Sequence, residues 1–142
     1  MRHFFASLSG LEEVPPVQTN ARGDAVFTIN EDEKMMEYRL IIHNLLNFTE
    51  AHIHLGRRGE NGPVVAFLFG PVDPGISVIQ GIVRGNLSRK DLVGPLKGHP
   101  FSALLREMRS GNTYVNCHTV QNPEGEIRCQ ISPGKIGGSG IR

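Results

Sequence analysis

Three histidines occupy positions from which they could hold one metal ion. His52 and His54 lie two residues apart in the stretch 49–56. If this stretch is a β-strand, its apolar residues share one face and both histidines share the other, because side chains alternate along a strand. His118 lies in a second strand-like run, 113–119, and by the same alternation it also points outward. Neutral imidazoles bind copper and zinc well, so the pattern predicts one transition-metal ion at these three residues.

The alternative is that these histidines have no shared role. The chain contains six histidines, so one His-x-His pair can arise without a metal. Outward histidines on a sheet can also stand in water or bond to the backbone. The other three, His3, His43 and His99, have no matching constellation and are interpreted as surface or capping residues.

The predicted hairpin that contains His118 offers three further candidates. Cys117 and Cys129 both fall on the inward side of facing strands, which allows either a cross-strand disulfide or two reduced core thiols. Reduced thiols are favoured because no export signal is visible. If the two cysteines face each other, Arg128 lies opposite His118, where an anion could contact both. The alternative is that Arg128 pairs with Glu126 or with another surface carboxylate.

Length and charge bound the classes of function. The 142 residues suit one domain, predicted over residues 1–132 and followed by a flexible tail, 133–142. With 15 Lys plus Arg against 14 Asp plus Glu, no overall basic field favours nucleic acid or an anionic membrane. No apolar run reaches the ~20 residues of a membrane helix. The first residues, 1–8, are typical of a strand, so we expect that any signal peptide is absent or already removed, and the cytoplasm is favoured.

Short strands and turns dominate the pattern. The 17 glycines and 9 prolines punctuate runs of alternating or continuous apolar residues. Strands are predicted over residues 3–9, 21–29, 36–42, 49–55, 63–69, 76–87, 114–119 and 126–131. Seven to eight strands at this spacing predict an all-β fold, a Greek-key antiparallel β-sandwich.

One short helix is predicted among the strands. In the segment 99–109, apolar residues recur at i, i+3, i+4 and i+7, and Gly111 follows directly. A helix of this length can cover one end of the sheets.

Several motifs together resemble the CHRD (chordin-type) domain family, which occurs in the extracellular protein chordin and as single-domain bacterial proteins. They are residues 9–17, 51–54, 61–65, 92–96 and 122–128, and the resemblance runs from about residue 4 to residue 132. It implies a β-sandwich module without an agreed reaction. Family members are often exported, so an extracellular location is the alternative to the cytoplasm.

A second similarity concerns chemistry. His52 and His54, followed much later by His118, are similar to the copper ligands of copper–zinc superoxide dismutase, whose fold is a sandwich of immunoglobulin-like type. The loop 56–62 contains no histidine or aspartate, so the zinc half of that enzyme is not expected.

These sequence patterns are consistent with three functions. The leading interpretation is a CHRD-type module that binds a single copper or zinc ion through the three histidines without catalysis. The first alternative is a metal-free module that binds a protein partner or a second copy of itself. The second is a copper-dependent oxidoreductase similar to superoxide dismutase.

Overall fold

The computed structural model describes residues 2–134, and β-strands account for most of them. In chain order the elements are β1 (His3–Ser9), the 3₁₀ helix η1 (Gly10–Glu12), β2 (Arg22–Ile29), β3 (Met35–Leu55), β4 (Val64–Phe69), β5 (Ile76–Ser88), the 3₁₀ helices η2 (Arg89–Asp91) and η3 (Gly94–Leu96), α1 (Phe101–Arg109), β6 (Thr113–Thr119), β7 (Ile127–Gln130) and β8 (Ser132–Pro133).

The long strand β3 organises the fold. Its first half pairs with β2 on one edge and β5 on the other, and its second half pairs with β6 and β4. The two halves meet at a bend where Asn44 and Asn47 have φ values of 57° and 55°. Asparagine tolerates this left-handed backbone better than most residues, so the chain can turn here without leaving the sheet. The predicted strands 36–42 and 49–55 are therefore one continuous strand.

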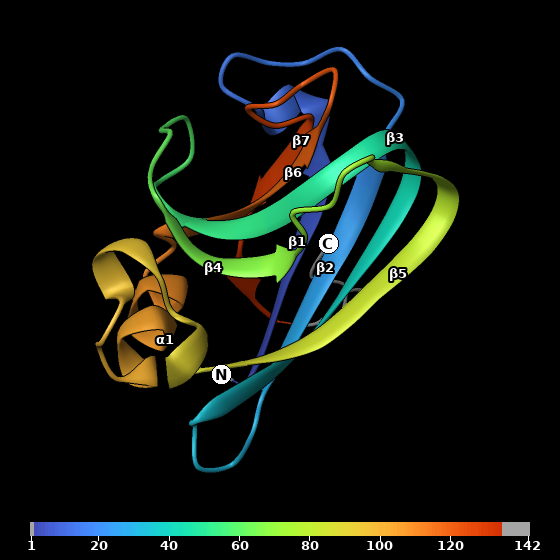
Figure 1. Ribbon diagram of the computed structural model, residues 1–142. Helices are drawn as coiled ribbons and strands as arrows, with labels where there is room; N and C mark the ends of the chain where they lie inside the picture. Colours follow the sequence, from blue (N-terminus) through green and yellow to red (C-terminus); the bar gives the residue numbers. More distant parts are fainter. Residues whose placement is uncertain (1, 135–142) are drawn as a thin grey trace.

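The strands close into a barrel. The order β2-β1-β7-β6-β3 is completed by the pairing of β3 with β2, so five antiparallel strands form a closed ring (Figure 1). The prediction of an antiparallel all-β fold with one short helix is confirmed. The structure differs from the predicted Greek-key sandwich because β3 belongs to both halves of the sheet and joins them edge to edge.

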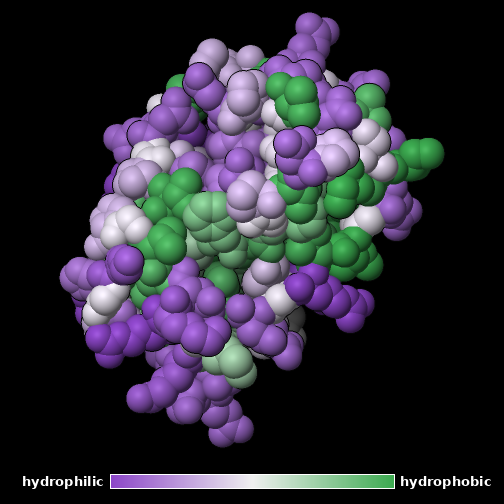
Figure 2. Space-filling model, viewed as in Figure 1, coloured by the Kyte–Doolittle hydropathy of each residue, from purple (hydrophilic) through white to green (hydrophobic). Residues whose placement is uncertain are grey.

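The core is the inside of this barrel. Alternate residues of β1 and β2 point inward, among them Phe4, Leu8 and Phe27, and each is at most 2% exposed. The helix α1 adds the four apolar residues predicted from its period, Phe101, Leu104, Leu105 and Met108, all buried. Figure 1 places α1 beside one end of the barrel. Apolar side chains also gather on the outer surface, in a band across the face formed by β4 and β5 (Figure 2).

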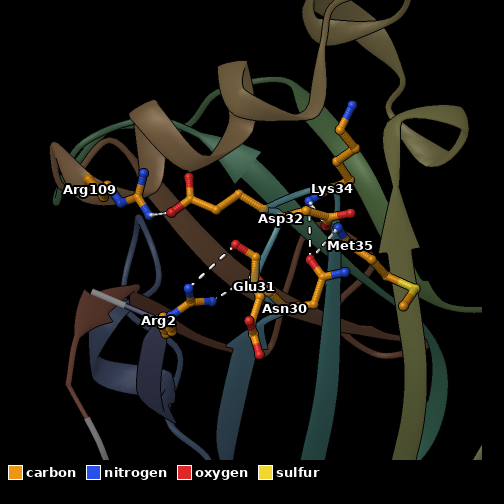
Figure 3. A network of polar contacts seen from close by, with 8 residues as sticks. Arg2, Asn30, Glu31, Asp32, Lys34, Met35 and Arg109 are labelled. Carbon is orange, nitrogen blue, oxygen red and sulfur yellow. Dashed lines mark hydrogen bonds and ion pairs between the residues drawn. The ribbon is translucent and has the colours of Figure 1, made fainter.

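The turn between β2 and β3 is fixed by polar contacts with two distant segments (Figure 3). The Asn30 side chain accepts hydrogen bonds from the backbone of Lys34 and Met35 at 3.1 and 3.0 Å. The Arg2 guanidinium donates to the carbonyl of Asn30 at 2.8 Å, and Arg109 at the end of α1 forms an ion pair with Glu33 at 3.2 Å. This network ties α1 to the end of the barrel.

The end of the described chain continues the sheet. Ser132 and Pro133 form β8, which pairs with β1, so the first residue of the predicted tail is part of the fold. The rest of that tail, residues 135–142, lies outside the described residues. Among residues 2–134, no helix has the length and apolar character needed to cross a membrane.

Candidate metal centre

The three predicted histidines converge. The second half of β3 and β6 pair antiparallel, with His52 opposite Asn116 and His118 opposite Glu50. One ring nitrogen from each of His52, His54 and His118 lies within 4.8 Å of the other two. The closest pair is Nδ1 of His52 and Nε2 of His118, 3.1 Å apart. The strands therefore place side chains from distant parts of the sequence around a single point.

The histidines point away from the barrel interior but are not in water. His52, His54 and His118 are 5%, 7% and 9% exposed. The loop 56–63 contacts His54 through the Gly62 carbonyl, and the hairpin loop 120–126 contacts His118 through the Pro123 carbonyl. The outward orientation predicted from strand alternation is confirmed, and the loops above the barrel wall bury the site.

Two hydrogen bonds fix which nitrogens of His54 and His118 are free. Nδ1 of His54 donates to the carbonyl of Gly62, and Nδ1 of His118 donates to that of Pro123, both at 2.9 Å. A carbonyl oxygen only accepts, so each Nδ1 carries the proton and each neutral ring leaves Nε2 unprotonated. Nε2 of His54 is buried and has no hydrogen-bond partner. It is a buried acceptor that no hydrogen-bond donor within the described residues satisfies.

Glu50 fixes which nitrogen of the His52 ring carries the proton, in the same way. Its carboxylate lies 2.9 Å from Nε2 of His52, which donates to it. In the neutral ring this leaves Nδ1 of His52 unprotonated and facing Nε2 of His118. One ring nitrogen of each histidine lies within 4.8 Å of the other two, and a proton, a metal ion or a hydrogen-bond donor can satisfy such unprotonated nitrogens.

Burial keeps two of these rings neutral. The pKa of His54 is lowered to about 4, chiefly by burial, although its hydrogen bond to Gly62 opposes the shift. Burial also lowers the pKa of His52, with a contribution from His118 and opposition from Glu50. A neutral imidazole is the form that binds a metal, so the site favours the metal-binding form over the protonated one at neutral pH.

Aromatic rings support the cluster from two sides. Tyr114 stacks on His54 with ring centroids 4.7 Å apart and an interplanar angle of 6°. Phe67 on β4 meets His52 edge-on, with centroids 4.5 Å apart. The Tyr114 hydroxyl accepts a hydrogen bond from the backbone of Gly62 at 3.0 Å. These contacts restrict rotation of the rings, which a metal site requires.

Arg128 does not lie where the sequence placed it. It stands opposite Asn116, and the predicted position opposite His118 is wrong because β7 pairs with β6 in a different register. The side chain is 1% exposed, and its guanidinium covers the ring of Tyr114 at 3.5 Å. It donates to the side chain of Asn61 at 2.9 Å and to the carbonyl of Arg57 at 3.1 Å. Arg128 thus fixes the loop that covers His54.

The same register separates the two cysteines. Cys117 faces Ile127 and Cys129 faces Val115, so the predicted opposition of the two thiols is also wrong. Both are free thiols, and burial raises the pKa of each. They lie on the core side of the strands, away from the histidines.

Glu13 and Glu126 are two buried carboxyl groups in the same region, and the charge of Arg128 acts on Glu13. Burial raises the pKa of Glu13 to about 7, with Arg128 lowering it and Glu126 raising it. Burial also acts to raise the pKa of Glu126, but hydrogen bonds, the first of them from Thr19 at 2.6 Å, outweigh it and lower that pKa. Glu126 therefore stays ionised beneath the hairpin loop, and it accepts hydrogen bonds there instead of pairing with Arg128.

Comparison with models of known protein families shows which family the chain belongs to. The CHRD domain family matches residues 4–131, which is most of the sequence. The chain belongs to the CHRD family. Comparison with curated proteins and with solved structures gave no match. The similarity to superoxide dismutase therefore rests on the histidine pattern alone.

The CHRD domain also uses residues that the sequence analysis missed. Glu50 shares the face of His52 and His54 in the pattern Glu-x-His-x-His, so strand alternation could have identified it. The carbonyls of Gly62 and Pro123 could not be identified, because any residue carries a carbonyl and only the fold brings these two to the rings. Within the described residues, His3, His43 and His99 are not part of the cluster.

Proposed function

We propose that this CHRD domain binds a single transition-metal ion through Nδ1 of His52 and Nε2 of His54 and His118. The observation that supports the proposal most directly is the buried Nε2 of His54, which has no hydrogen-bond partner. An unsatisfied buried acceptor is costly, and two further unprotonated nitrogens face the same point. A cation bound there would satisfy all three.

The donor set favours copper or zinc. Three neutral imidazoles are ligands of intermediate softness, which suits these ions better than magnesium or calcium, whose preferred ligands are oxygens. Each ring holds its second nitrogen in a hydrogen bond, to Glu50 or to a backbone carbonyl, as is usual for metal-bound histidine.

Burial favours binding of the ion over turnover of a substrate at it. The three histidines are at most 9% exposed, and loops 56–63 and 120–126 contact the rings. An ion in this position is shielded from large substrates. The proposed role is therefore a metal-binding module, with the ion joining β3 to β6.

Metal titration tests the proposal. The purified protein, stripped with a chelator, is titrated calorimetrically with Cu²⁺ and separately with Zn²⁺. We expect one ion per chain and a rise in the unfolding temperature on loading. The Cu²⁺ complex should show nitrogen couplings in its electron paramagnetic resonance spectrum.

Matched variants decide which residues bind. His54→Leu should abolish stoichiometric binding, while His99→Ala, at an exposed position outside the cluster, should leave it unchanged. Circular dichroism of each stripped variant shows whether it is folded. Absence of binding in the folded protein, or unchanged binding in a folded His52→Ala/His118→Ala double variant, would overturn the proposal.

A further inference from the structure

The strand β5 is an edge of the sheet with no covering segment. Its 13 residues pair with β3 along one side. Among residues 2–134, no other strand pairs with its second side. A free strand edge presents unpaired N–H and C=O groups in the spacing that another extended chain can bind.

The other edge of the sheet, at β4, is covered by a neighbouring segment. β4 pairs with β3 only, but the segment after η2 covers its other side. Leu92 forms a bridge with Ala66, and the backbone N–H of Val93 donates to the carbonyl of Val65 at 2.8 Å. A covered edge cannot pair with a partner, so β5 is where the sheet can be extended.

The composition of β5 lacks the features that block pairing. Between Ile76 and Ser88 it contains no proline, lysine or acidic residue, and Arg84 is its only charged residue. Natural edges are commonly protected by such residues. Instead, β5 exposes Ile79 by 83% and Ile82 by 53%. Figure 2 shows the resulting apolar band over β4 and β5.

We infer that β5 pairs antiparallel with β5 of a second copy of this chain and forms a symmetric dimer. A two-fold axis at Gly81 places Ile79 opposite Val83 of the second copy, and Arg84 opposite Val78. In this register Ile79 meets an apolar residue, Ile82 meets Gln80, and no like charges face each other, which a two-fold symmetric contact needs.

The size of the contact indicates a weak dimer. A strand of 13 residues is about 44 Å long at ~3.4 Å per residue, and a sheet is about 10 Å thick. The two edges together therefore bury about 900 Å². This is below the roughly 1,600 Å² of a typical stable interface, so we expect association that depends on concentration in the micromolar range.

Sedimentation velocity between about 1 and 500 μM tests the dimer. The wild-type protein should shift from monomer to dimer, and Ile79→Lys/Ile82→Lys should raise the dissociation constant at least tenfold. Both positions are exposed, so the double variant should remain folded, as circular dichroism can verify. Leu11→Lys, which adds a charge at a position 79% exposed outside β5, is the matched control.

Hydrogen exchange identifies the contact. Amides of β5 should become more protected as the protein concentration rises, and amides of β4 should not. A wild-type chain that stays monomeric over the whole range would overturn the inference, because the edge would then serve a different partner or none. A dimer that the double variant retains would overturn it equally. Neither result depends on metal, so the experiment is independent of the proposed metal site.

Discussion

Nδ1 of His52 and Nε2 of His118 lie 3.1 Å apart on facing strands, and the hydrogen bonds of the two rings leave neither nitrogen a proton in the neutral state. Two lone pairs at this distance repel each other. A shared proton would relieve the repulsion, but burial and the neighbouring His118 lower the pKa of His52 and oppose it. A metal ion relieves it at neutral pH, so the pair is arranged for an ion more than for a proton.

Glu50 should control the affinity of this centre through His52. Its carboxylate accepts the proton of Nε2 at 2.9 Å and so directs Nδ1 toward the other two rings. In Glu50→Leu the ring loses this partner, and we expect the metal affinity to fall about 10- to 100-fold. Glu50→Gln keeps an accepting oxygen and should cost less. Competition with a chromophoric chelator measures both.

The exposed residue Glu37 provides the control for this prediction. It lies on the first half of β3, away from the cluster, and Glu37→Leu should leave the affinity unchanged. Equal affinity in wild type and Glu50→Leu would show that Glu50 does not orient His52.

The stability of the metal-free protein should depend on pH through His54. Its pKa is about 4 in the folded chain against 6.5 for an ordinary histidine. Between these values the unfolded chain binds a proton that the folded chain does not, so the contribution of His54 to the free energy of unfolding rises with pH and is lost as pH falls from 6.5 to 4. The full difference is about 3 kcal/mol.

Glu13 acts in the opposite direction, so the effect of His54 must be measured as a difference. Burial raises the pKa of Glu13 from 4.5 to about 7, and its contribution to stability is lost as pH rises through that range. Urea unfolding from pH 4 to 8 should therefore show a larger rise with pH in wild type than in His54→Leu. The exposed His99→Ala variant should match wild type. Parallel profiles for wild type and His54→Leu would contradict the prediction.

Arg128 should be a stabilising residue and not a ligand contact. It is buried against Tyr114 and donates to Asn61 and to the carbonyl of Arg57. Arg128→Met removes the donor of these part-buried hydrogen bonds and the contact of the guanidinium with Tyr114, and we expect a loss of about 3 kcal/mol in the free energy of unfolding. Urea unfolding measures it. The exposed Arg84→Met should change stability by less than about 0.5 kcal/mol, and a similar loss in both variants would contradict the interpretation.

The sequence predicts the strands and the shared face of His52 and His54 well because both depend on local alternation, whereas the approach of His118 to this pair depends on the pairing of β3 with β6. The apolar period of β2 and the pattern of His52 and His54 are each contained in a few neighbouring residues. The register of β6 against β7 is not local. The hairpin loop sets it, and a shift of two residues keeps each side chain on its predicted face while changing its partner, as happened to Arg128 and Cys129.

Closure of the barrel and burial of the site also escape sequence reasoning. Asn44 and Asn47 bend β3 without ending it, whereas their sequence signature is that of a turn between two strands. The burial of His54 depends on the loop 56–63, which reads as an exposed glycine turn. Only its hydrogen bonds, from His54 to Gly62 and from Arg128 to Arg57, show that it covers the site.

Gly62 should be required for both stability and metal binding. A Cβ atom at this position would overlap the carbonyl oxygen of Leu55, so any larger residue forces the loop away from β3. The displaced backbone would lose its hydrogen bonds with His54 and Tyr114, at 2.9 and 3.0 Å. We expect Gly62→Ala to cost about 3 kcal/mol and to weaken metal binding at least tenfold.

Gly81→Ala is the matched control for Gly62→Ala, because the nearest atom to its added Cβ is 3.5 Å away, an ordinary contact. Urea unfolding and chelator competition on both variants separate a steric effect of the loop from a general effect of replacing glycine. If Gly62→Ala loses stability but keeps the wild-type metal affinity, the Gly62 carbonyl does not fix the tautomer of His54. If both variants behave like wild type, the loop 56–63 is free to move and does not hold the ring of His54 in place.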